Sequence, residues 1–269
     1  ANVISIVRGL DKPIDLSGIE FQQIHVYDYG GWKYDSLVKS LPFDKSFIFT
    51  TSPATKEYLI NTLGFPEKNI FIALPPVDME LFSTKLKPVK YKLIHIGNHK
   101  KADNDIYHDR MKSIIDTLDV KVWGMNWNGH IKDNHKLKGR SGFFETTKIY
   151  SQSEYALGLM YPFQREVTFS GRFWQATLNG CLLFSEPGLY SKSIPGIIET
   201  NYTIQDIQNK MVSVTTSRQQ LVKEAKEYWN TNNIKNINIH KELNLLLKDY
   251  NIGVYACCKY TCLNNLRVI

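Results

Sequence analysis

Short apolar runs alternate with amphipathic stretches along most of the chain, and this alternation constrains the fold more than any other feature. Runs of about four to seven apolar residues are typical of buried strands, and they occur at 3–7, 24–27, 46–50, 70–74, 93–96, 120–123, 155–160 and 181–184. Amphipathic spacing predicts helices at 53–63, 107–118, 144–151, 172–178, 204–214, 218–229 and 239–250. Strands separated by helices need right-handed crossovers, which produce parallel sheets covered on both faces. The predicted fold class is therefore α/β.

Two interruptions in this pattern suggest a domain boundary. Pro75 and Pro76 are adjacent, and a lysine-rich connector follows at 83–90. Paired prolines and charged connectors are typical of hinges, so we place the boundary near residue 88. The predicted parts are an N-terminal lobe, a larger C-terminal domain, and a closing helix with a tail, at 1–88, 89–238 and 239–269. The asparagine-rich segment 230–238 is predicted to be a loop.

Composition excludes several classes of protein. Apolar residues make up 43% of the 269 residues and charged residues 22%, which is typical of a globular chain and not of a disordered or collagen-like one. No apolar run reaches the roughly 18 residues of a membrane-spanning helix. The first residues also lack the basic segment of a signal peptide. We therefore expect a cytoplasmic protein.

The four cysteines suit a reducing compartment. Cys181 lies in an apolar run and is predicted to be buried. Cys257, Cys258 and Cys262 crowd the C-terminal tail without a nearby histidine. Three thiols make a poor zinc site, because structural zinc usually takes four ligands. We expect reduced thiols and no bound metal.

The net charge of +7 favours anionic partners such as phosphorylated ligands, acidic glycans, nucleic acid or an anionic membrane surface. The excess is spread along the chain without a long basic run, so a small phosphate-bearing ligand is as well supported as a polyanion. Aromatic and basic residues are not interleaved on any one element, so we expect no nucleic-acid partner. Peripheral contact with a membrane is a further expectation.

The segment 150–186 carries the most informative polar residues. A predicted strand enters a loop and then a helix, and this connection contains Arg165, Glu166, Ser170, Gly171, Arg172 and Gln175. Loops at the carboxyl ends of parallel strands bind ligands in open α/β sheets. A helix N-terminus offers free N–H groups to an anion, and an arginine adds a planar fork for phosphate. The alternative is an ordinary turn with a solvated arginine, and the residues alone leave both open.

Here the sequence resembles a known family. The segment 172–183 reads RFWQATLNGCLL, which is similar to the R-x-F-E-A-x-A-x-G-x-x-L-L pattern in the C-terminal domain of group 1-type GT-B glycosyltransferases, especially their CgeB-like branch. Upstream, LIHIGN at 93–98 resembles the first strand and glycine turn of that domain, and VKVWG at 120–124 resembles its next strand. The segment 51–82 resembles the end of a GT-B N-terminal domain. The resemblance covers about residues 46–250.

The resemblance implies a GT-B-like architecture of two Rossmann-like lobes with parallel sheets, the N-terminal lobe being abbreviated. It implies transfer of a sugar from a nucleoside diphosphate sugar donor to a hydroxyl of a glycan or glycoconjugate acceptor. The donor would lie in the cleft between the lobes, mostly on the C-terminal one. Enzymes of this kind generally need no bound metal, so we expect no cofactor beyond the donor.

The resemblance also implies roles for particular residues. Gly97, Asn98 and Lys100 would meet the diphosphate from the first loop, with Lys101 beside them. Ser170, Gly171 and Arg172 would meet it from the other side. Trp123 and Gly124 would flank the nucleotide base, and Gln175 would bond a ribose hydroxyl. The alternatives are that Lys100 and Lys101 form a solvated turn, and that Trp123 belongs to the core while Trp127 lies at the surface.

The sequence also departs from the family pattern. Many retaining members carry two glutamates at a fixed spacing, whereas Gln175 occupies the second position and Glu166 lies nine residues before it, one too many. Gln175 can still donate and accept hydrogen bonds, but without charge. A non-catalytic nucleotide- or glycan-binding module is therefore an alternative function.

Candidates for a catalytic base precede the predicted boundary. His25, Asp28 and Asp35 lie in an aromatic, glycine-containing segment after a predicted strand, and an inverting transfer needs such a group to take the acceptor proton. The alternative is a structural histidine with turn-forming aspartates. Asp103 and Asp105 form a D-x-D pair that could hold a hard cation, but helix capping is the better interpretation.

Overall fold

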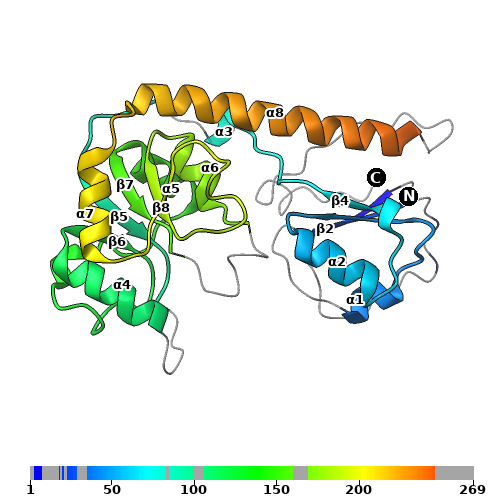
Figure 1. Ribbon diagram of the computed structural model, residues 1–269, viewed down its shortest axis with the longest axis horizontal. Coiled ribbons are helices and arrows are strands. Elements are labelled where there is room, and N and C mark those ends of the chain that lie inside the picture. The colour runs from blue at the N-terminus through cyan, green and yellow to red at the C-terminus, as the bar shows by residue number, and fades with distance from the viewer. Residues whose placement is uncertain are drawn as a thin grey trace. The chain divides into compact units, whose positions relative to one another are not determined.

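The computed structural model describes residues 3–7, 18, 20, 23–28, 35–82, 85–99, 106–159 and 169–245. The chain divides into two compact units (Figure 1). Unit 1 comprises 1–77, 166–170 and 231–269, and unit 2 comprises 78–165 and 171–230. The first passage between units thus follows Val77, next to the paired prolines, whereas the sequence suggested residue 88.

Unit 1 contains a parallel sheet with the strand order β1-β2-β3-β4. Its strands are β1 (Val3–Val7), β2 (Gln23–Asp28), β3 (Ser46–Thr50) and β4 (Ile70–Ile72), and its first helices are α1 (Asp35–Ser40) and α2 (Pro53–Asn61). A short 3₁₀ turn, η1 (Glu67–Asn69), leads into β4. Ile24, Val26 and Ile48 pack with Leu37 of α1 and Leu59 of α2. The alternate residues of the same strands belong to a second apolar cluster, so both faces of the sheet are covered.

Unit 2 contains a second parallel sheet, with the order β6-β5-β7-β8-β9. Its strands are β5 (Tyr91–Ile96), β6 (Val120–Trp123), β7 (Ser153–Leu157), β8 (Leu182–Ser185) and β9 (Ile197–Glu199). Its helices are α3 (Met79–Phe82), α4 (Ile106–Thr117), α5 (Phe143–Ser151), α6 (Arg172–Thr177) and α7 (Ile204–Ser213), with a 3₁₀ turn, η2 (Asn134–Lys136). The core brings Leu93 and Tyr155 of the strands together with Ile114 of α4 and Ile207 of α7. The predicted α/β class with parallel sheets is confirmed.

A single helix, α8 (Arg218–Leu245), begins in unit 2 and ends in unit 1. It includes 230–238, so the loop predicted there is wrong. Asparagine disfavours helices because its amide competes for backbone bonds, but here those amides bond another segment. The Asn233 side chain accepts a hydrogen bond from the Val77 amide at 2.9 Å and donates one to the Val77 carbonyl at 2.7 Å. The Asn236 side chain donates to the Leu74 carbonyl at 3.0 Å.

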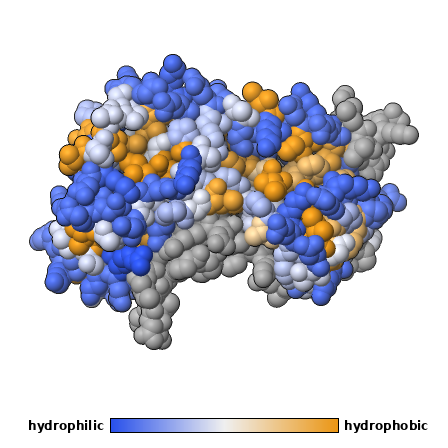
Figure 2. All heavy atoms as spheres, in the orientation of Figure 1, coloured by the Kyte–Doolittle hydropathy of each residue, from blue (hydrophilic) through white to orange (hydrophobic). Residues whose placement is uncertain are grey.

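The surface of the described residues mixes hydrophobic and hydrophilic side chains. In the view of Figure 2 hydrophobic residues form small groups between hydrophilic ones. Among the described residues, no helix has the length and apolar character to cross a membrane.

Lys136 closes the C-terminus of α4 and gives a first prediction. Its buried Nζ donates to the Ile115 carbonyl at 2.5 Å and to the Leu118 carbonyl at 2.8 Å. Lys136→Met should leave these acceptors without their donor and lower the free energy of unfolding by about 2 kcal/mol. Urea denaturation measures this change. Lys138→Met, at an exposed position nearby, is the matched control, and equal stability of the two variants would contradict the assignment.

Candidate functional site

The strand order of unit 2 locates a point where ligands bind in open α/β sheets. The chain passes from β5 to β6 on one side and then returns to place β7 on the other side of β5. Such a reversal opens a crevice beyond the carboxyl ends of the two central strands, because their following loops turn in opposite directions. The candidate site therefore lies at the ends of β5 and β7, next to Gly97 and Gly158.

Arg172 from the start of α6 reaches both strand ends. Its Nη1 donates to the Leu159 carbonyl, just beyond β7, at 3.3 Å. Its Nη2 lies 2.9 Å from the position that a Cβ atom on Gly97 would occupy. A side chain at residue 97 would therefore force the guanidinium group to shift. The structure brings together Gly97 and Arg172, which the sequence assigned to opposite sides of one anion.

Backbone packing holds the Gly97 turn in place. The Gly97 amide donates to the Trp123 carbonyl at 2.9 Å, and Trp127 Nε1 donates to the Gly97 carbonyl at 2.7 Å. A Cβ atom on Gly124 would lie 1.9 Å from the Gly97 carbonyl oxygen. Gly124 is thus required by the close approach of two loops. Asn98 joins the same loops, since its Oδ1 accepts from the Met125 amide at 2.8 Å.

The helix dipole contributes less to this site than the sequence suggested. Helix α6 has six residues, and its N-cap Gly171 carries no side chain to cap it. So short a helix sums few peptide dipoles, so within the described part of this site the Arg172 side chain is a stronger source of positive charge than the helix. Burial raises the pKa of the nearby Tyr150 hydroxyl, while the charge of Arg172 acts on that pKa in the opposite direction.

A pocket opens beside these loops, beyond the end of β6. Its volume is about 740 Å³, which is ample for a nucleoside. It is lined by Gly124, Met125, Asn126, Trp127, Asn128, His130, Leu137, Gly139 and Arg140. His130 stacks on His99, with ring centroids 3.9 Å apart. The sequence patterns did not single out His130 and Arg140, although their place after the carboxyl end of a strand could have indicated them.

Several solved structures with a similar fold are glycosyltransferases. One from Rickettsia africae matches over 84% of this chain and 71% of its own, at 13% identity and a TM-score of 0.54. AviGT4, involved in avilamycin A biosynthesis, matches over 85% and 75%, at 10% identity and a TM-score of 0.56. Anabaena HepE, solved with UDP-glucose, matches over 82% and 72%, at 10% identity and a TM-score of 0.53.

The chain has the GT-B glycosyltransferase fold. The fold resemblance seen in the sequence is thereby confirmed. No family model matches the chain, and no curated protein matches it in sequence. The CgeB-like branch stays a prediction.

Within this GT-B fold, the two tryptophans are both buried. Trp123 is 4% exposed and meets Tyr91 edge-on, so its ring presents little surface to a nucleotide base. Trp127 is 2% exposed, which shows that its suggested surface position is wrong. Its indole is directed at the Gly97 carbonyl instead. The pocket wall, and not Trp123, is the surface that a base could contact.

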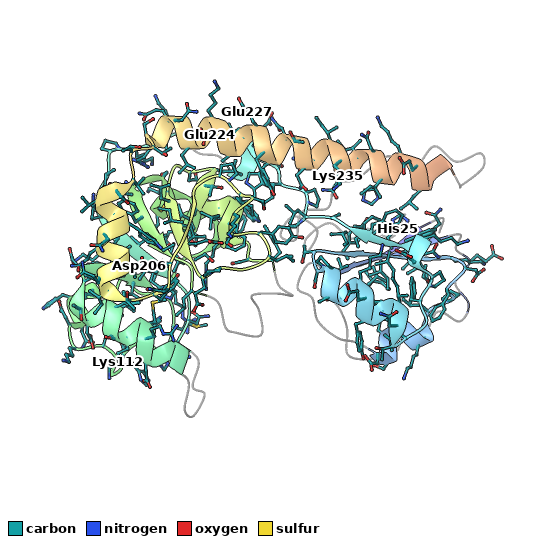
Figure 3. All side chains as sticks on the ribbon, viewed as in Figure 1. His25, Lys112, Asp206, Glu224, Glu227 and Lys235 are labelled. Atoms are coloured by element: carbon teal, nitrogen blue, oxygen red, sulfur yellow. The ribbon has the colours of Figure 1, made fainter. Side chains whose placement is uncertain are left out.

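His25 does not have the surroundings of a catalytic base. It lies on β2 in unit 1, beneath the last turns of α8 (Figure 3), and is 4% exposed. Its Nε2 donates to Gln23 Oε1 at 2.8 Å, because the Gln23 amide nitrogen is itself bonded to the Leu243 carbonyl at 3.1 Å. Burial separates the ring from an acceptor hydroxyl and, with the charge that His240 can carry, lowers the pKa of His25 from 6.5 to about 4, which makes it a weak base. The structure therefore favours the alternative of a structural histidine.

Several predicted site residues remain to be placed. Lys100, Arg165 and Glu166 lie outside the described residues, as do Lys101, Asp103, Asp105, Cys257, Cys258 and Cys262.

The other predicted site residues have described positions. Asp28 ends β2, but its side chain is outside the description. Asp35 accepts a hydrogen bond from the Tyr58 hydroxyl at 2.7 Å. Ser170 is half-buried next to the exposed Gly171, and Gln175 is half-buried on α6. The described residues include no group of three or more His, Cys, Asp or Glu placed to hold a metal ion.

Proposed function

We propose that this chain is a glycosyltransferase that moves a sugar from a nucleoside diphosphate sugar to a hydroxyl of a glycan or glycoconjugate. The observation that carries the proposal is the Arg172 guanidinium at the point between β5 and β7, beside the Gly97 turn. A planar cation at this point of the sheet suits a diphosphate. The GT-B fold and the net charge of +7 support the same ligand class.

The proposed chemistry depends on charge at the leaving group. Cleavage of the bond between sugar and diphosphate leaves negative charge on the terminal phosphate oxygens. A cation fixed near those oxygens lowers the barrier, because its stabilisation grows as the charge develops. Arg172 would supply that cation, and the pocket with His130 and Arg140 would hold the nucleoside. The proposal therefore assigns no step to a metal ion.

A thermal-shift screen with UDP, GDP, CDP and TDP, with and without Mn²⁺, tests the donor and the metal together. We expect one nucleotide to raise the melting temperature of the wild-type chain by several degrees, in the absence as well as the presence of Mn²⁺. No shift with any nucleotide would contradict the proposal. Stabilisation only with Mn²⁺ would contradict its metal-independent form.

A non-catalytic nucleotide-binding module is the second candidate. Gln175 occupies the position at which many members of the family that the sequence resembles carry a glutamate. The two candidates differ in whether they release free nucleotide from the donor. A glycosyltransferase slowly hydrolyses its donor when no acceptor is present, whereas a binding module releases no free nucleotide. Chromatography of a donor incubated with the chain distinguishes them, with Arg172→Ala as the blank.

A further inference from the structure

His95 is a buried histidine in an otherwise apolar strand, β5, and lies beside the proposed diphosphate site. It is 2% exposed, and its Nδ1 lies 3.1 Å from the Leu157 carbonyl oxygen at the end of β7. A carbonyl oxygen can only accept, so this bond places a proton on Nδ1. In the neutral ring the proton-free nitrogen is therefore Nε2.

That nitrogen faces the same point as the Arg172 guanidinium. His95 Nε2 and Arg172 Nη2 each lie 2.9 Å from the position of a Cβ atom on Gly97, so they are at most 5.8 Å apart. Protonation of His95 would place a second positive charge beside the first. Without a ligand, repulsion between the two cations opposes this protonation.

Other described groups also surround His95. Its sheet neighbours, Val122 of β6 and Leu157 of β7, carry no charge. Trp127 meets the imidazole edge-on, with ring centroids 5.5 Å apart, and His99 also contacts that indole, at 5.1 Å. Among the charged groups on α4, Arg110 pairs with Glu186, which follows β8, at 3.3 Å. Within the described residues, Arg172 places a cation beside the His95 ring at the Gly97 turn.

We propose that His95 is a positioning residue that couples donor binding to proton uptake. This inference rests on the proposed function, because it requires a diphosphate beside Arg172. The two negative charges of a bound diphosphate would offset the repulsion from Arg172 and favour the imidazolium form. Binding would then take up a proton on Nε2, while the bond from Nδ1 keeps β5 and β7 aligned. Affinity for the donor should therefore rise as the pH falls.

Calorimetric titration measures this coupling directly. The probe is whichever of UDP-glucose, GDP-mannose and dTDP-glucose binds the wild-type chain most tightly, since nucleotide sugars have no terminal phosphate that titrates near neutrality. Affinity for the wild type should rise about tenfold between about pH 8 and pH 6. Repeating the titration in two buffers with different ionisation enthalpies should show net uptake of protons by the wild type.

Variants separate this role from a purely structural one. His95→Asn keeps a donor for the Leu157 carbonyl but removes Nε2, so it should bind with little dependence on pH and without that proton uptake. His135→Asn, at an exposed position, is the matched control and should behave as the wild type. An unchanged pH profile in His95→Asn would overturn the proposal. If that variant does not fold, absence of proton uptake by the wild type overturns it equally well. Failure of all three nucleotide sugars to bind the wild type would instead refute the proposed function, and the inference with it.

Discussion

Replacing Arg172 with alanine is expected to lower donor turnover by about 100- to 1000-fold, with little effect on folding. The guanidinium group places a cation next to Gly97 at the ends of β5 and β7, where the diphosphate would develop charge. Its Nη1 donates a 3.3 Å bond to the Leu159 carbonyl, and water can replace such a bond at a half-buried position. Release of nucleotide from the donor, followed at saturating concentration, measures the effect.

Two further variants give this experiment its controls. Arg172→Lys keeps the charge but loses the planar fork, so its turnover should lie between those of the wild type and Arg172→Ala. Lys92→Ala removes an exposed cation of the same unit that pairs with Glu154 at 2.7 Å, and should leave turnover unchanged. Wild-type turnover in Arg172→Ala would refute the assignment of the site. A parallel loss in Lys92→Ala would indicate a general effect of net charge.

Most strands could be predicted because a strand of a covered parallel sheet is apolar on both faces. The runs at 46–50 and 120–123 coincide with β3 and β6. The run at 155–160 begins two residues after the start of β7, since Ser153 and Glu154 are polar and carry no apolar signal. The asparagines of α8 misled the prediction for a related reason. Their amides bond residues more than 150 positions earlier, and such partners are not visible in a local pattern.

The candidate site was predictable to the extent that it depends on topology. Gly97 and Arg172 both lie at carboxyl ends of parallel strands or in the following loops, so their meeting could be expected. The close approach of Gly124 to the Gly97 carbonyl could not, because it depends on the path of two backbones. The surroundings of His25 could not be predicted for a similar reason. Its aromatic sequence neighbours suggested a sugar-binding loop, but His25 and Tyr27 lie on a sheet face covered by a helix from the far end of the chain.

The histidines on this covered sheet face of unit 1 give a second prediction. We expect unit 1 to lose stability in mild acid. The His25 and His240 rings lie 5.7 Å apart between β2 and α8, with Phe49 stacked on His240 at 5.0 Å. Burial, and then the positive charge that His240 can carry, lower the pKa of His25 from 6.5 to about 4. Burial lowers the pKa of His240 as well. Both imidazoles are therefore held neutral in the folded state.

The sign of the effect follows from proton binding. Between about pH 6.5 and pH 4 the unfolded chain protonates His25 while the folded chain does not, so the unfolded state binds more protons. Stability is therefore complete above pH 6.5 and declines as the pH falls. The shift in the pKa of His25 corresponds to roughly 3 kcal/mol, of which about 2 kcal/mol is lost by pH 5. His240 adds to this loss in the same direction.

Hydrogen exchange of the backbone amides in β3 measures the opening of this sheet between about pH 7.5 and pH 5, after correction for intrinsic rates. Protection in the wild type should fall about 30-fold over this range, which corresponds to the 2 kcal/mol lost from His25. His25→Gln removes the titrating ring beneath α8 and should abolish most of that fall, with a remainder from His240. His135→Gln changes an exposed histidine and should follow the wild type. Equal pH dependence in His25→Gln and the wild type would show that the His25 ring is not what makes the sheet of unit 1 sensitive to acid.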